Sequence, residues 1–66
     1  MFHVEMKHTE GKRWMVMSIG QAKMILHAAH PQIHRSELHE RVRRIMMILP
    51  LVKDVQFEDM TLRVHY

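Results

Sequence analysis

Three histidines in the middle of the chain are the residues whose spacing comes nearest to that of a metal site. His27, His30 and His34 occupy positions i, i+3 and i+7, in a chain where seven of 66 residues are histidines. On one continuous helix these imidazoles would lie along one flank and could together bind zinc or nickel. Pro31 stands inside the triplet, however, and proline ends or kinks a helix. We therefore expect no cofactor, and a metal site here is the least favoured of three functions.

Basic residues raise a second possibility, binding to nucleic acid. The formal net charge is +3 and the pI is about 9.8. Glu37 precedes Arg41 by four positions, and Glu40 precedes Arg44 in the same way, which is a favourable spacing for ion pairs on a helix. Two arginines are therefore expected to be neutralised within the chain. The remaining candidates for phosphate contacts are Lys12, Arg13, Arg35, Arg43 and Arg63.

Catalysis has little support. The chain has no cysteine nucleophile and only two glycines, which form no phosphate-binding loop. Ser18 and Ser36 each precede an apolar helical pattern, so we interpret both as helix caps and neither as a nucleophile. We expect a protein that is not an enzyme.

Methionine is unusually frequent, with eight residues. Several methionines remain after a core has been assigned, and methionine suits adaptable contact surfaces. A 66-residue chain without disulfides or a metal is also marginally stable alone, and association is a common remedy. We therefore expect a homodimer with an apolar interface formed by Met15, Met17, Met24 and Met47.

The sequence predicts two strands at the start of the chain, and these strands position the candidate residues of its first part. Apolar and polar residues alternate over residues 2–8, and residues 12–17 are rich in strand formers. A three-residue loop, Thr9-Glu10-Gly11, would join them, with glycine at the left-handed position of a bulge. This loop predicts the pairs Met6–Trp14 and Val4–Val16, which places Trp14 on the inner face and Met15 and Met17 on the outer face.

Two helices follow. Ser18 and Gln21 form a capping box ahead of an apolar stripe, and Pro31 ends the first helix. Ser36 is the expected cap of the second helix, and Pro50 closes it. The stripe of the first helix is Ala22, Ile25, Leu26 and Ala29, and that of the second is Leu38, Val42, Ile45, Met46 and Leu49.

The last segment predicts another hairpin. Residues 55–58 and 61–66 alternate between apolar and polar, and a two-residue loop at Asp59-Met60 pairs Phe57 with Leu62. All four aromatic residues then face inward, so the outer face offers no surface on which bases could stack.

These elements predict an α+β fold in a single domain over residues 1–66. Hairpin, two helices and hairpin (ββααββ) would form a four-stranded antiparallel sheet with both helices on one face. A winged-helix-like arrangement is the alternative. The hairpins could pair within one chain or between two copies.

The function we expect is that of a small regulatory protein-binding module, of inhibitor or adaptor type, that acts as a homodimer and also binds another protein. The alternative is a small basic nucleic-acid-binding regulator. Lack of cysteine and of a membrane-spanning pattern favours a cytoplasmic protein without a membrane partner. Size and composition suit small regulatory proteins of phages, plasmids or bacteria, and also an engineered chain.

Overall fold

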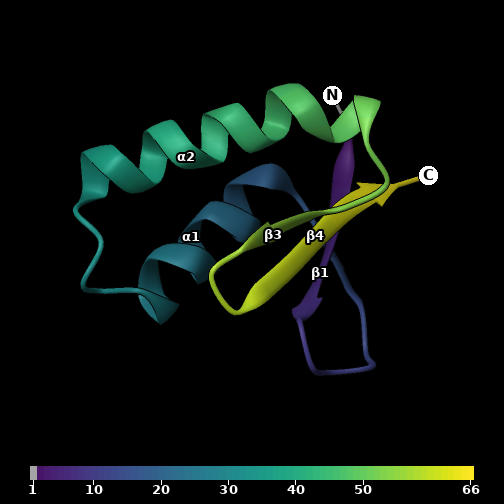
Figure 1. Ribbon diagram of the computed structural model, residues 1–66, viewed down its shortest axis with the longest axis horizontal. Helices are drawn as coiled ribbons and strands as arrows, with labels where there is room; N and C mark the ends of the chain where they lie inside the picture. Colours follow the sequence, from purple (N-terminus) through teal and green to yellow (C-terminus); the bar gives the residue numbers. More distant parts are fainter. Residues whose placement is uncertain (1) are drawn as a thin grey trace.

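The computed structural model describes residues 2–66, which form one antiparallel sheet covered by two helices (Figure 1). The order of elements is β1 (His3–His8), β2 (Met15–Met17), α1 (Ile19–Ala29), α2 (Arg35–Ile48), the short 3-10 helix η1 (Leu49–Leu51), β3 (Val55–Phe57) and β4 (Met60–His65). The predicted ββααββ fold is confirmed, and the winged-helix alternative is wrong.

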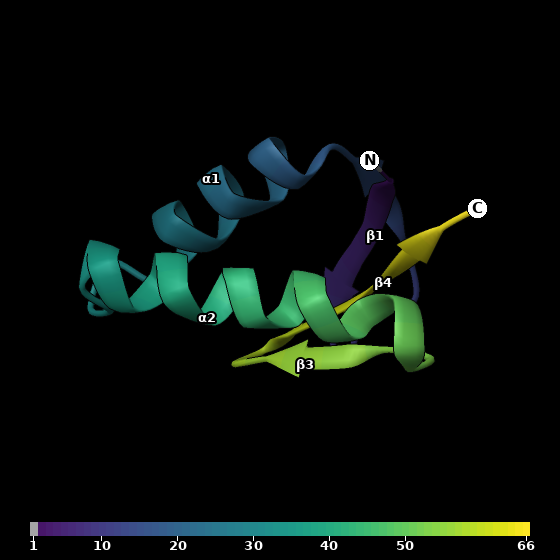
Figure 2. The same ribbon diagram turned by 90° about the horizontal axis from the view of Figure 1, so that it is seen from above.

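The strand order β2-β1-β4-β3 joins the two hairpins within one chain. The central strands β1 and β4 pair over their whole length, from His3 opposite His65 to His8 opposite Met60. The short strands β2 and β3 form the two edges of the sheet. Both helices cover the same face, as the two views in Figures 1 and 2 show.

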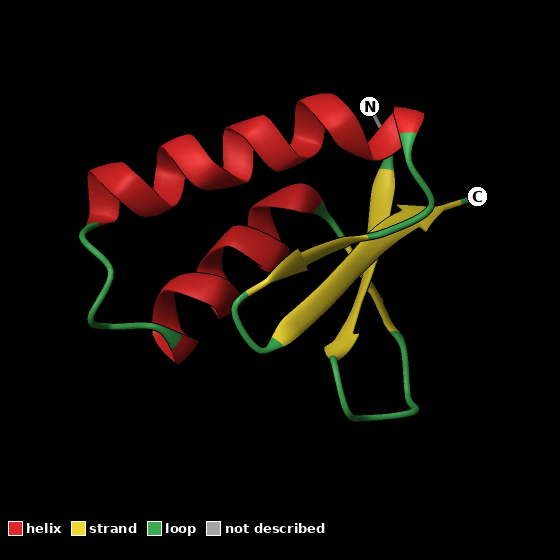
Figure 3. Cartoon of the chain, viewed as in Figure 1, coloured by secondary structure: helices red, strands yellow, loops and turns green. Residues whose placement is uncertain are grey.

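The register of the first hairpin differs by one residue from the prediction. Met6 lies opposite Met15, and Val4 lies opposite Met17. The loop spans residues 9–14 (Figure 3), which is longer than predicted, and Gly11 does not adopt the left-handed conformation. Because side chains alternate along a strand, this shift exchanges the faces. Met17 therefore packs in the core, 6% exposed, and Trp14 does not.

The register of the second hairpin differs by two residues, so its faces are kept. Phe57 lies opposite Met60, and Val55 lies opposite Leu62. The turn is Glu58-Asp59 rather than Asp59-Met60, and Glu58 has a φ of 53°, a left-handed conformation that costs free energy in a residue with a side chain. Met60 consequently joins the core.

The first helix has the predicted capping box. The Ser18 Oγ accepts a hydrogen bond from the Gln21 N–H at 3.1 Å, and the Gln21 side chain accepts one from the Ser18 N–H at 3.0 Å. Its buried stripe is Ala22 and Leu26, while Ile25 and Ala29 are exposed. The stripe continues beyond the helix into His30 and Ile33, which are both buried.

The second helix begins two residues earlier than predicted. Its N-cap is His34, whose Nδ1 accepts a hydrogen bond from the Ser36 N–H at 3.2 Å, so Ser36 lies inside the first turn. Pro50 lies within η1, directly after α2. The buried side chains of this segment are Leu38, Val42, Ile45 and Leu49, with Met46 half-buried beside them.

The core lies between the helices and the inner face of the sheet. Its largest fully buried side chains are Phe57, Met6, Leu26, Leu49, Leu62 and Val4. Every strand and helix contributes to this one cluster. Among the described residues, no helix combines the length and the apolar character that crossing a bilayer requires.

Candidate functional site

The edge strand β2 and helix α1 border a groove whose lining is uncharged and mostly apolar. Ser18 alone separates the end of β2 from the start of α1, so the capping box at Ser18 and Gln21 fixes the corner between strand and helix. The groove has a volume of about 270 Å³. The described residues that line it are Met15, Val16, Met17, Gln21, Met24 and Ile25. We refer to this set as the β2–α1 groove.

Several exposed apolar side chains stand at the rim of this groove. Met24 is 73% exposed, Met15 59% and Val16 53%. Met17 packs in the core, whereas Met15, two residues earlier on the same face, remains exposed. Val16 lies opposite Glu5 and points to the outer face of the sheet. Apolar side chains therefore flank the free strand edge on both faces.

The structure divides the four methionines of the predicted interface. It brings Met15 and Met24 together at the β2–α1 groove. It places Met17 in the core, because of the register shift. Met47 belongs to another exposed apolar surface at the end of α2, together with Ile48, Leu51 and Val52. Sequence reasoning did not include Val16 and Ile25, which the predicted pattern placed inside.

The outer face of the sheet carries Trp14, against the prediction. The Arg63 guanidinium lies 3.9 Å from the centre of the Trp14 ring, and the Lys7 ammonium lies 5.3 Å from it. Arg63 also donates two hydrogen bonds to Glu5, at 2.9 and 3.2 Å. These bonds from Arg63 hold the pKa of the Glu5 carboxyl below its usual value, although desolvation acts in the opposite direction.

The candidate phosphate contacts come from four separate places in the fold. Lys12 and Arg13 lie in the loop before β2, Arg35 begins α2, Arg43 is exposed in the middle of α2, and Arg63 is in β4. Arg63 is already engaged by Glu5 and Trp14. The ring of Trp14 is itself covered by cations, so it is not a free surface for stacking a base.

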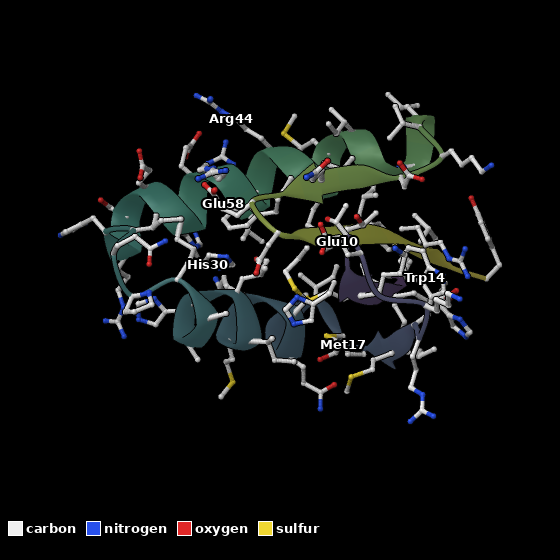
Figure 4. The ribbon with its side chains drawn as sticks, turned by 60° about the horizontal axis from the view of Figure 1, so that its bottom comes forward. Glu10, Trp14, Met17, His30, Arg44 and Glu58 are labelled. Atoms are coloured by element: carbon white, nitrogen blue, oxygen red, sulfur yellow. The ribbon has the colours of Figure 1, made fainter. Side chains whose placement is uncertain are left out.

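The two predicted helix ion pairs have different outcomes. Arg44 approaches Glu40, at 3.6 Å, as predicted, and points away from the molecule (Figure 4). Arg41 instead pairs with Glu58 of the β3–β4 turn, at 3.0 Å, while its guanidinium stacks 4.2 Å from the centre of the Phe57 ring. Arg41 therefore ties α2 to the turn instead of stabilising its own helix through Glu37.

The histidine triplet is not brought together. His30 is 5% exposed and points from the end of α1 toward the β3–β4 turn (Figure 4), whereas His27 and His34 are exposed and line a hollow between the helices. Within the described residues, no group of three His, Asp or Glu side chains could hold a metal ion.

His30 instead links α1 to the β3–β4 turn. Its Nδ1 donates to the Leu26 carbonyl at 3.0 Å, and its Nε2 lies 2.9 Å from the Asp59 carboxylate. Both partners are acceptors, so a ring that donates from both nitrogens satisfies the two bonds. The His30 hydrogen bond is the main reason why the pKa of the Asp59 carboxyl lies below its usual value. The spacing of His30, four residues after the buried Leu26, was a signal for its burial.

Comparison with models of protein families, with curated proteins and with solved structures found no match to this chain. The proposals below therefore rest on the residues and their geometry.

Proposed function

We propose that this chain is a non-enzymatic protein-binding module that works as a homodimer, with β2 of one copy pairing with β2 of a second copy. The observation that carries this proposal is an uncharged, exposed edge strand beside an exposed apolar helix face. Met15, Val16 and Met17 contain no charge and no proline, the usual devices that protect a sheet edge. Met24 and Ile25 extend the same apolar surface onto α1.

The opposite edge of the sheet is better protected. Strand β3 has the exposed Gln56 at its centre, and Asp54 and Glu58 flank it on either side. A second β3 edge would bring these carboxylates near those of its partner. The two edges are equally short, so charge is what distinguishes them, and it favours β2 as the pairing edge.

Charge also favours a second copy as the occupant. An antiparallel pair centred on Val16 places the two Val16 side chains opposite each other and Met15 opposite Met17 of the other copy. Arg13 precedes Val16 by three residues, about 10 Å of extended chain. Two-fold pairing carries the two Arg13 residues in opposite directions, about 20 Å apart, which exceeds the screening length of about 8 Å.

The small size of the core supports association. A chain of 66 residues without disulfides buries a modest fraction of its surface, so a second copy that covers Met15, Val16 and Met24 adds to the stability of each. The surface of Met47, Ile48, Leu51 and Val52 lies outside this interface. As an inhibitor or adaptor, the dimer would also bind a different protein.

A matched pair of valine variants tests the proposal by sedimentation velocity. Val16→Lys places two ammonium groups opposite each other at the dimer axis, where like charges destabilise pairing. Val52→Lys adds the same charge at a similarly exposed valine, 47% against 53%, outside the interface. We expect a mass of about 16 kDa, twice the 8.0 kDa of one chain, for the wild type and Val52→Lys, and a monomer for Val16→Lys. A monomeric wild type, or equal behaviour of the two variants, would contradict the proposal.

Met17→Glu does not test association, because Met17 lies in the core and the substitution would unfold the chain. Met24→Glu is a suitable second variant, since the side chain of Met24 is 73% exposed in one chain. We expect it to weaken the dimer while the folded monomer remains.

A further inference from the structure

A hollow of about 610 Å³ lies between α1 and the first turns of α2, apart from the core. Basic and imidazole side chains from both helices line it: Lys23 and His27 from α1, and His34, Arg35 and His39 from the beginning of α2. No carboxylate stands among the described residues that line it. The nearest acids in sequence, Glu37 and Glu40, lie outside this lining, and Glu40 is directed to Arg44.

Hydrogen bonds determine which protons two of these imidazoles carry. The Lys23 ammonium, which can only donate, lies 2.9 Å from the Nδ1 of His39. The Nδ1 of His34 accepts from the backbone N–H of Ser36 at 3.2 Å. Since Nδ1 is an acceptor in both rings, the proton of each neutral ring must be on Nε2. His34 and His39 therefore each have an Nε2–H donor and no second free lone pair.

This proton arrangement favours an anion over a metal ion. A metal ion would need the Nε2 lone pair, which a proton occupies in both rings. An anion needs donors, and the residues that border the hollow carry them together with two permanent charges, on Lys23 and Arg35. A guanidinium matches the geometry of a phosphate particularly well, and the beginning of α2 adds the positive end of its helix dipole.

Most of the exposed lining of the hollow is apolar. Met24 and Leu38 line it together with the basic groups, and Leu38 is almost fully buried. A bound molecule would therefore contact hydrocarbon with one part and donors with another. We propose that the hollow binds a small organic phosphate, with its dianionic head held by Lys23, Arg35 and the imidazoles and its apolar body on Met24 and Leu38. Met24 borders both this hollow and the proposed dimer interface, so binding is also measured on the monomeric Val16→Lys variant, which keeps the two proposals distinguishable.

Phenyl phosphate is the probe, with isothermal titration calorimetry and amide chemical shifts of the wild-type chain as readouts. We expect binding at millimolar concentration or below, with the largest shift changes at Lys23, His27, Arg35 and His39. Phenol and inorganic phosphate, which each supply half of the probe, should bind at least about tenfold more weakly. Absence of heat and shift changes, or equal binding of phenol, would overturn the proposal.

Two exposed arginines of α2 provide a matched pair of variants. Arg35→Gln removes a charge that lines the hollow, and Arg43→Gln removes one that does not. We expect Arg35→Gln to weaken phenyl phosphate binding about tenfold or more, the effect of losing one charge-assisted hydrogen bond, and Arg43→Gln to change it less than about twofold. Equal loss in both variants would show a general charge effect and overturn the proposal.

A single-stranded oligonucleotide serves as the comparison arm. A small phosphate ester whose head binds the basic groups and whose body lies on Met24 and Leu38 should not need a polymer, so phenyl phosphate should compete with the oligonucleotide for any common site. An oligonucleotide that binds through Arg43 as well as Arg35, and that phenyl phosphate does not displace, would assign these charges to nucleic acid and contradict the proposal.

Discussion

Replacing His30 by leucine removes the side chain that joins α1 to the β3–β4 turn. His30 bonds the Leu26 carbonyl and the Asp59 carboxylate, and its ring packs edge-on against Phe57, with 5.5 Å between ring centres. Leucine has a similar volume, so the substitution removes the hydrogen bonds without leaving a large cavity. The His30→Leu variant therefore isolates the contribution of this polar link.

The expected loss follows from the partners that remain. The Leu26 carbonyl still accepts a hydrogen bond from the backbone N–H of residue 30, at 3.1 Å in the wild type, so it is not left unsatisfied. The Asp59 side chain is 65% exposed and can be hydrated. No buried polar group is left without a partner, so the loss is that of the hydrogen bonds themselves; because one of them joins a charged carboxylate, we expect about 2 kcal/mol. For a domain of this size, Tm falls by about 8–16 °C.

Thermal unfolding at neutral pH, followed by circular dichroism, measures this effect. His27→Leu is the control, because His27 lies on the same helix one turn earlier but is exposed, and its substitution should change stability by less than about 0.5 kcal/mol. A Tm of His30→Leu within about 2 °C of the wild type would refute the reasoning. So would an equal loss in the control.

Two further predictions concern the carboxylates and the corrected register. The folded pKa values of Glu5 and Asp59 lie below their ordinary values of 4.5 and 3.8, so the unfolded chain binds more protons there, and stability should fall as the pH falls below about 4.5. Urea titrations between about pH 6 and pH 2 check this, and Asp59→Asn should flatten the lower part of the profile. Met17→Ala should cost about 2–4 kcal/mol, because Met17 is buried, and Met15→Ala less than about 1 kcal/mol. An equally small loss for Met17 in a monomeric sample would instead support the register predicted from the sequence, which places Met17 on the outer face.

Periodicity and capping residues were sufficient to predict the helices and strands. They were not sufficient to predict the length of the loop between β1 and β2. The capping box at Ser18 and Gln21 and the break at Pro31 placed the first helix correctly. A three-residue loop that ends at Gly11 was plausible from residue preferences alone. The long-range contact of Trp14 with Arg63 of β4, which favours the longer loop, cannot be read from the local sequence.

The two errors of register had unequal consequences for the candidate site. A shift of two residues kept Val55 and Phe57 on the inner face. A shift of one residue exchanged Met17 for Val16, so one predicted interface residue became core and one predicted core residue became exposed. Met15 moved from the predicted outer face to the inner face but is still 59% exposed, and Met24 stands on α1, where its exposure does not depend on the register of β2.

The most direct test of the account is a nuclear Overhauser effect between two copies of the chain. In a sample that mixes isotope-labelled and unlabelled protein, antiparallel pairing predicts contacts from the Val16 methyl groups of one copy to Val16 of the other, and from Met15 to Met17. Intermolecular contacts that involve these residues would support the β2–β2 dimer. A dimer whose intermolecular contacts lie only at Met47, Ile48 and Leu51, or a sample with none at all, would contradict it.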